Sequence, residues 1–310
     1  MEKELKKKHN DKEEAELEKE PNESEKEEVK LQIRNAVIMN DIFSRAVFKN
    51  PKCTEILVNT ILENPVKVIE SITQYNMENA IGRAAIVDVL AKTKDGKRIV
   101  IEIQKITEEG LPLRARHICS VSDANLIGRG ARFRDIHEFF VIFIMEKDPF
   151  GRGQSIYKVY RIFDDTHELF PDKQTIIFVN GATKEEGELR ELLDDFSTRD
   201  YWKMKNRVFR EEVRHIKSST EKEDREMIKF FTEEMRKEAQ LREAKSREEG
   251  LAEGIEIGRE EGREEGREEG REEGFFQSAI NLLKLGFSVE DAQRVTGLSI
   301  EKINELKAAF

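Results

Sequence analysis

The sequence predicts an α/β protein with a mixed central sheet flanked by helices, followed by a long charged helical tail and a small C-terminal helical module. Three observations predict this fold class. Residues 86–104 contain two β-branched apolar runs joined by a polar turn, which is typical of a β-hairpin. Residues 139–145 form a continuous apolar run short enough for a central strand. Segments with apolar residues at helical spacing flank both, and this mixture indicates layers of helices on a sheet.

Charge is distributed unevenly along the chain. Hydrophobic residues make up 37% of the sequence and charged residues 38%, so part of it cannot be core. Residues 1–30 carry 8 basic and 12 acidic side chains, a net of −4, and residues 221–274 carry 12 and 20, a net of −8. The whole chain has a net charge of −10, which leaves +2 for the remaining residues and does not argue against nucleic-acid binding. We therefore expect a disordered charged arm over 1–35, a core over 36–217, a charged helical region over 218–275 and a small helix-turn-helix-like module over 276–310.

Two short helices and one strand are expected ahead of the hairpin. Asp41 to Phe48 and Thr54 to Leu62 have the apolar spacing of amphipathic helices, and Pro51 separates them. Val66 to Tyr75 is the predicted first strand. The helices are expected to pack their apolar faces on the sheet.

Each strand of the predicted hairpin contains an acid where a buried strand normally has none. Asp88 lies in the first apolar run, and Glu102 lies in the second with Gln104 on the same face, because side chains alternate along a strand. A two-residue loop at Asp95–Gly96 would place Asp88 opposite Ile103. A three-residue loop with a left-handed Gly96 in a G1 bulge would place Asp88 opposite Glu102, with Cβ atoms about 5 Å apart. We predict the three-residue loop because glycine suits its last position.

Two facing carboxylates indicate a cation site. They repel each other and are costly to bury unless a cation or a shared proton compensates. Oxygen ligands without histidine favour Mg²⁺ or Mn²⁺ over zinc, and such an ion can polarise a phosphodiester and lower the pKa of a bound water. The alternative is that Asp88 and Glu102 are strand-end charges that pair with Lys or Arg and face solvent.

A helix is expected over Pro112 to Gly128, just after the hairpin. Arg114, Arg116 and His117 cluster in its first turns. Their positive charge is suited to clamping phosphates, since the planar guanidinium group matches them. An ordinary solvated helix face would have the same charge pattern.

The remaining core elements follow from shorter patterns. Strands are predicted over 139–145, 155–163 and 175–180, and helices over 185–196 and 201–216. The last helix is expected to close the core with four apolar side chains, Trp202, Val208, Phe209 and Val213.

The tail repeats glycine every four residues from Gly250 to Gly274, within an Arg-Glu-Glu-Gly repeat near its end. A period of four is close to 3.6, so the glycines would form one slowly winding stripe on a helix. Each glycine costs about 1 kcal/mol relative to alanine, which makes an isolated helix marginal. We expect a helix that associates with another copy of the chain, which makes the protein a homo-oligomer. A charged, partly helical linker is the alternative.

The last 35 residues regain an apolar helical pattern. A helix over 276–285 is expected to end at Gly286, a second to begin after Ser288 and to end at Gly297, and a third to begin after Ser299. Gln293 stands where a DNA-reading helix-turn-helix normally has a small residue, and the charges of the last helix cancel. A helical packing module is therefore at least as well supported as a DNA-binding one.

The ordered series of motifs resembles the PD-(D/E)xK nuclease superfamily, and within it the Rpn-type recombination-promoting nucleases and putative transposases. The series begins with Asp88, Glu102 and Gln104. It is accompanied by Gly82–Arg83, Leu113–His117, Phe143–Ile144, Asp148–Gly151, Tyr157 and Ile177–Asn180. The resemblance covers roughly residues 39–217. His117 departs from it where a tyrosine is common, and Ile86 departs where a basic residue is common.

This resemblance implies a restriction-endonuclease-like core and a Mg²⁺-dependent DNA endonuclease. It implies Asp88 and Glu102 as metal ligands and Gln104 in place of the superfamily's lysine. It also favours Arg114 and Arg116 as phosphate contacts. Because the superfamily often adds an acid from its first helix, Glu55 is a possible third acid, with a surface charge as the alternative. The expected role is recombination, transposition or defence. A catalytically inactive DNA-associated scaffold is the rival function.

Composition also excludes some classes of protein. No apolar run approaches the ~20 residues that a membrane helix needs. The charged N-terminus lacks the apolar segment of a signal peptide. Cys53 and Cys119 have no metal-site spacing, which suits a reducing environment. We therefore expect a cytoplasmic protein without membrane contact.

Overall fold

The structure is a computed structural model of the 310-residue chain, and it describes residues 19–77, 84–104, 110–126, 132–221 and 224–308. The chain divides into two compact units, Met1–Arg236 and Lys237–Phe310. Gly82 and Arg83, which belong to the motif series, lie outside the described residues.

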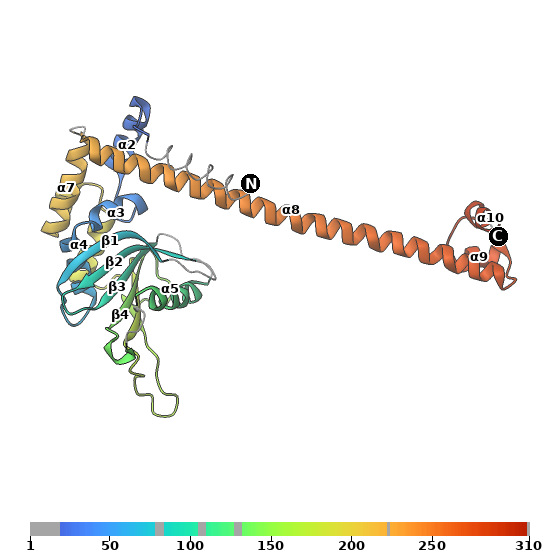
Figure 1. Cartoon of the computed structure of the whole chain (residues 1–310), viewed down its shortest axis with the longest axis horizontal. Helices are drawn as coiled ribbons and strands as arrows, with labels where there is room; N and C mark the ends of the chain where they lie inside the picture. Colours follow the sequence, from blue (N-terminus) through green and yellow to red (C-terminus); the bar gives the residue numbers. More distant parts are fainter. Residues whose placement is uncertain (1–18, 78–83, 105–109, 127–131, 222–223, 309–310) are drawn as a thin grey trace. The chain divides into compact units, whose positions relative to one another are not determined.

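The first unit is built on a mixed six-stranded sheet with the order β1-β2-β3-β4-β6-β5 (Figure 1). The strands pair antiparallel from β1 to β3, parallel from β3 through β4 to β6, and antiparallel again at β5. This arrangement confirms the predicted mixed sheet. The strands are β1 (Val68–Met77), β2 (Ala85–Thr93), β3 (Arg98–Gln104), β4 (Phe139–Met145), β5 (Ile156–Val159) and β6 (Gln174–Asn180).

Helices cover both faces of the sheet. One face packs against α2 (Glu23–Asn35), α3 (Asp41–Phe48), α4 (Pro51–Ile61), α6 (Glu188–Ser197), α7 (Arg207–Glu221) and the first turns of α8 (Arg225–Lys284). The other face packs against α5 (Leu111–Leu126). The chain also has two 3₁₀ turns, Phe133–Asp135 and Tyr201–Lys203. The result is a helix–sheet–helix sandwich with one apolar cluster on each side of the sheet.

Strand β3 determines which face receives the acids. Ile99, Ile101 and Ile103 belong to the cluster opposite α5, and Val100 belongs to the cluster on the α5 side. Since alternate side chains share a face, Glu102 and Gln104 lie on the α5 face.

The β2–β3 turn has the predicted three-residue loop. Thr93 N–H donates to the Lys97 carbonyl at 3.1 Å, and Gly96 is left-handed with φ 88°. A Cβ on Gly96 would also lie within 2.6–2.8 Å of the His137 ring, so glycine is required for packing as well as for the turn. The pairs Lys92–Arg98 to Val89–Ile101 follow the predicted register. The regular pairs stop at Val89–Ile101, one residue before Asp88 and Glu102.

Three expectations about the core need correction. Residues 23–35 are not a disordered arm but helix α2, because Val29 and Ile33, one turn apart, are both buried in the core. Trp202 does not close the core, because its side chain lies on a short 3₁₀ turn and is 64% exposed. The first unit extends beyond residue 217 to Arg236, since Ile228 and Phe231 of α8 are buried in the core.

The second unit contains the rest of α8, α9 (Val289–Thr296) and α10 (Ile300–Ala308). Helix α8 ends at Lys284, and Gly286 follows with φ 88°. Ser288 forms a capping box with Asp291, and Gly297 is left-handed at the end of α9. The predicted ends and caps of these helices are confirmed, whereas the separate helix expected over 276–285 is wrong, because these residues are the end of the continuous helix α8. Among the described residues, none of the helices has both the length and the hydrophobicity that crossing a membrane requires.

Candidate functional site

Asp88 lies at a kink shared by β1 and β2. Val87 packs in the cluster on the α5 side, whereas Val89 packs in the opposite cluster, so the alternation of side chains is interrupted at Asp88. The β1 residue in register with Asp88 is Gln74, which has φ 54°. A positive φ is unusual for a residue other than glycine and is found where the surrounding structure imposes it.

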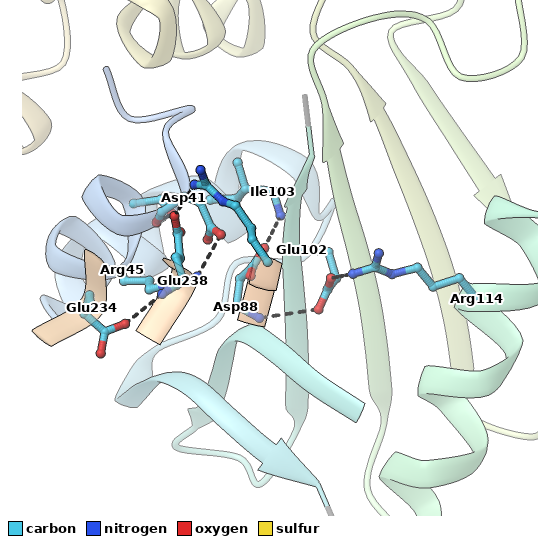
Figure 2. Close-up of polar contacts among 10 residues, drawn as sticks. Asp41, Arg45, Asp88, Glu102, Ile103, Arg114, Glu234 and Glu238 are labelled. Atoms are coloured by element: carbon cyan, nitrogen blue, oxygen red, sulfur yellow. Dashed lines mark hydrogen bonds and ion pairs between the residues drawn. The ribbon is translucent and has the colours of Figure 1, made fainter. Parts of the chain in front are cut away.

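Strands β2 and β3 separate at this position. Their regular pairs end at Val89–Ile101. Beyond it, the Asp88 carboxylate accepts the Ile103 N–H at 2.7 Å, where a regular ladder would use a backbone carbonyl. The Asp88 N–H in turn donates to Glu102 Oε1 at 3.4 Å. The separation therefore brings both acidic side chains to one place between the strands (Figure 2).

Glu102 is buried, with 1% of its surface exposed. Arg114 of α5 donates to its Oε2 atom at 2.8 Å. The Gln104 amide oxygen, turned toward the same guanidinium group, accepts from Arg114 Nη1 and Nη2 at 2.9 and 3.0 Å. Two of the expected site residues and one expected phosphate contact thus form a single hydrogen-bonded cluster.

Both acids have raised pKa values. Burial raises the pKa of Glu102 to about 8, the negative charge of Asp88 adds to the shift, and Arg114 opposes it. Burial likewise raises the pKa of Asp88 to about 6, and the charge of Asp41 adds to it, whereas the Ile103 N–H, Arg45 and Arg114 oppose it. Both carboxylates are therefore harder to ionise than ordinary acids, which is typical of functional sites.

A buried ion network lies on the other side of Asp88. Arg45 of α3 donates to Asp41 at 2.7 Å and to Glu234 of α8 at 2.7 Å (Figure 2). It also donates through Nε to the Gln74 amide oxygen at 2.8 Å. Arg45 therefore joins the first unit's α3 and α8 to the kinked residue of β1 that faces Asp88.

The structure places Glu55 away from Asp88. Glu55 accepts from Lys67 Nζ at 3.0 Å and from the Val68 N–H at 2.9 Å, where β1 begins. Val68 pairs with Thr93 beside the hairpin turn, five residues along β2 from Asp88. The helix acid whose charge acts on Asp88 is Asp41, which sequence reasoning missed. The sequence feature that could have pointed to Asp41 is its position at the start of α3, four residues before Arg45.

Two further residues of α5 differ from Arg114 in their surroundings. Arg116 is exposed and lies on the solvent side of the helix. His117 is half-buried, and its Nε2 atom has no hydrogen-bond partner among the described residues. Of the three basic residues, only Arg114 reaches the acids through a hydrogen bond or ion pair in the described structure.

The donor set fits a hard divalent cation. It consists of carboxylate oxygens that already attract a guanidinium group, and Mg²⁺ often uses one or two carboxylates and completes its shell with water and phosphate. Within the described residues, no group of three or more His, Cys, Asp and Glu side chains is arranged to hold a metal by itself. The site therefore fits an ion bound jointly by protein and substrate.

The Asp148–Gly151 motif forms a hydrogen-bonded loop after β4. Asp148 accepts from the N–H groups of Phe150, Gly151 and Gly153 at 3.0, 3.0 and 2.7 Å, and from the Tyr157 hydroxyl at 2.7 Å. The Tyr157 hydrogen bond, with help from these N–H groups, lowers the pKa of Asp148 to about 2. One carboxylate thus connects two parts of the motif series.

The comparisons with known proteins agree with this geometry. Residues 38–252 match the model of the PD-(D/E)XK nuclease family transposases. No curated protein and no solved structure matches the chain. The match covers more than two thirds of the chain and includes the mixed sheet, both acids, Gln104 and α5. The chain therefore belongs to the PD-(D/E)XK nuclease family of transposases.

Proposed function

We propose that the first unit is a metal-dependent DNA endonuclease that hydrolyses phosphodiester bonds. The observation that carries the proposal is the pair of acids, Asp88 and Glu102, at the point where β2 and β3 separate. Asp88 and Glu102 would hold Mg²⁺ (or Mn²⁺), with Asp41 as a nearby third acid. The activity would serve recombination, transposition or defence.

The chain's own residues supply binding and orientation. Arg114 pairs with Glu102 and offsets part of its charge in the metal-free protein, and its guanidinium group is suited to a DNA phosphate once a cation takes over that role. Gln104 would orient the attacking water or the scissile phosphate through its amide, without the charge of a lysine. Arg116, exposed on the same helix, would contact the DNA backbone. A divalent cation, when bound, would polarise the phosphodiester and lower the pKa of a bound water.

The rival is a catalytically inactive, DNA-associated scaffold. It is favoured by one observation, the Arg114–Glu102 ion pair, because that pair compensates the buried acid without any metal. In this case the fold would be retained for DNA binding and assembly only.

Nicking of supercoiled plasmid DNA by the full chain in Mg²⁺ or Mn²⁺ distinguishes the endonuclease from the inactive scaffold. We expect nicking by the wild type and a loss of at least roughly 100-fold in Asp88→Asn and Glu102→Gln. Glu55→Gln is the matched control, because it changes an acid of the same unit outside the site, and it is expected to nick normally. Nicking that survives both site substitutions would remove these residues from the mechanism. No nicking with either metal would favour the scaffold.

We also propose that the chain forms homo-oligomers through its helical tail. All seven glycines from Gly250 to Gly274 lie on α8 with nothing within 4 Å of an added Cβ. This open stripe supports close approach of a second helix. A nuclease gains from such pairing because one site nicks one strand and two sites cut both.

Cys53 and Cys119 are free and buried, which supports the expected cytoplasmic location.

A further inference from the structure

A cavity lies on the same face of the sheet as Glu102. Glu102, Phe143, Phe178 and Tyr157 form one row of paired residues across β3, β4, β6 and β5. Phe143, Phe178 and Tyr157 all belong to the cluster on the α5 side. Since neighbouring strands are about 4.8 Å apart, Phe178 lies roughly 10 Å from Glu102 along this row. The row leads from Glu102 to the cavity.

The cavity has a volume of about 420 Å³ and mainly apolar walls. Phe150, Tyr157, Ile176 and Phe178 line it from the sheet side, and Pro112 and Ala115 line it from α5. Phe150 stands edge-on to the rings of Tyr157 and Phe178, with centroids 5.0 and 5.1 Å away, and 36% of its surface is exposed. Part of the Phe150 ring is thus accessible to a flat ligand.

The loop that carries Phe150 is held in one conformation. Asp148 binds three of its N–H groups and the Tyr157 hydroxyl, as described above. Gly151 and Gly153 have φ values of 65° and 74°, which the turn requires. A ligand that stacks on Phe150 would therefore need little further ordering of the protein.

Polar and basic groups lie at the edge of the cavity. Arg152 and Gln154 line it and are exposed, and Lys158, which is paired with Glu63, lines it as well. Gln154 can present an amide to the edge of a base, and Arg152 can contact a phosphate. Apolar walls, an aromatic ring and a basic rim are complementary to a nucleobase on its sugar–phosphate backbone.

We propose that this cavity holds one unpaired nucleobase of the DNA strand that is cut. The proposal rests on the proposed nuclease function and adds a substrate class to it, namely DNA with an unpaired base near the scissile phosphate. A separation of roughly 10 Å corresponds to about three stacked nucleotides, at 3.4 Å each. The base has to be unpaired, because a base inside a duplex cannot expose its face to Phe150.

Fluorescence anisotropy in EDTA tests the proposal with the full chain. The probes are a labelled single-stranded oligonucleotide, a fully paired duplex, and the same duplex with one unpaired nucleotide. Phe150→Leu keeps the apolar bulk and removes the aromatic face, and Phe150→Trp is its matched control. We expect Phe150→Leu to weaken binding of the two unpaired probes by roughly 5- to 100-fold. Duplex binding should change less than twofold, and Phe150→Trp should behave as wild type.

A second measurement covers the case in which Phe150→Leu folds poorly. The chain has one tryptophan, Trp202, so Phe150→Trp combined with Trp202→Phe reports from the cavity alone. Its fluorescence should be quenched by the unpaired probes and not by the duplex. Equal quenching by all probes, or a Phe150→Leu variant that binds all of them as wild type does, would overturn the proposal.

The outcomes also separate this proposal from the proposed function. The binding assay contains no metal and leaves Asp88 and Glu102 unchanged. If nicking depends on Asp88 but Phe150→Leu has no effect, the nuclease stands and the base cavity fails. If the wild type does not nick but Phe150→Leu selectively loses the unpaired probes, the cavity stands and the nuclease fails.

Discussion

At the scale of single residues, the site buries two acids, Asp88 and Glu102, next to each other, and this burial lowers the free energy of unfolding. Glu102 is buried next to Asp88, and Arg114 compensates only part of their negative charge. Asp88 is oriented by the Ile103 N–H, and Gln104 is oriented by Arg114. Such arrangements are typical of sites that are completed by a ligand, because the ligand supplies the missing charge.

Glu102→Gln is expected to stabilise the metal-free protein by several kcal/mol at pH 8.5, up to about 5 kcal/mol, and by less than about 1 kcal/mol at pH 5. The pKa of Glu102 is raised from about 4.5 to about 8 in the folded protein, which disfavours its charged form there. The resulting destabilisation is absent below pH 4.5, grows between the two pKa values and is complete above pH 8. Glutamine is neutral throughout and removes it. Urea unfolding in EDTA at both pH values measures the difference.

The same variant tests the cation site. Mg²⁺ should stabilise the wild type against urea and leave Glu102→Gln unchanged, because only the folded wild type binds the ion. Glu55→Gln is the control and should follow the wild type in both buffers. Equal stability of wild type and Glu102→Gln at pH 8.5 would show that Arg114 compensates the buried charge completely.

At the scale of elements, helix α8 is part of the core as well as of the tail. Its residues Ile228 and Phe231 are buried, and Phe231 stacks on Phe43 of α3 with centroids 6.3 Å apart. Glu234 forms a buried ion pair with Arg45, with side chains 10% and 8% exposed. The first turns of α8 therefore help to position α3 and, through Arg45, the kink at Gln74.

Glu234→Ala is expected to destabilise the protein by about 3 kcal/mol, because the buried Arg45 guanidinium group loses one of the carboxylates that compensate its charge. Plasmid nicking should also fall, since Arg45 holds Asp41 and Gln74 beside Asp88. Urea unfolding and the nicking assay measure the two effects.

The neighbouring acid provides the control. Glu233 is 3.6 Å from Lys229 in a partly exposed pair on the helix surface, and such pairs contribute little. Glu233→Ala should therefore change stability by less than about 0.5 kcal/mol. A Glu234→Ala protein as stable and as active as Glu233→Ala would show that α8 does not support the site.

At the scale of the whole molecule, the sequence separates a near-neutral middle from acidic ends. The tail part of α8 is exposed along the Arg-Glu-Glu-Gly repeat from residue 259 to residue 274. Each of its glycines costs about 1 kcal/mol relative to alanine, so the helix needs another source of stability. Pairing with a second copy provides one, because the repeat presents small residues and both signs of charge.

The full chain is expected to self-associate, and a variant that ends at Ala252 is expected to be monomeric. This end point keeps the whole first unit and the whole family match, and removes most of the glycine stripe. Light scattering at about 1 to 100 μM covers the range in which weak association appears. Helicity of the full chain should rise with concentration, because helix formation is coupled to assembly. If the full chain and the variant that ends at Ala252 are both monomeric across this range, the tail is a charged linker.

The sequence by itself determined most of the core strands and helices, the mixed sheet and the hairpin register, but it missed helix α2 and the continuity of α8. These features depend on residues close together in the chain. The Asp95–Gly96 turn sets the pairing of β2 with β3, and period-two patterns set their faces. The family could be identified from the same local motifs, because their identity and their order along the chain can be read from the sequence alone. Strand β4 and helix α3 even have the predicted bounds.

Only the tertiary structure decided which groups meet Asp88 and Glu102. Arg114 reaches Glu102 because α5 packs on that face, and Arg45 meets Glu234 across 189 positions of sequence. Glu55 and Asp41 are both acids on short helices, and helix packing alone directs one to Lys67 and the other toward Asp88. A charged side chain has no periodicity that reveals its distant partner. Its position follows from how apolar faces pack, and packing is a property of the whole fold.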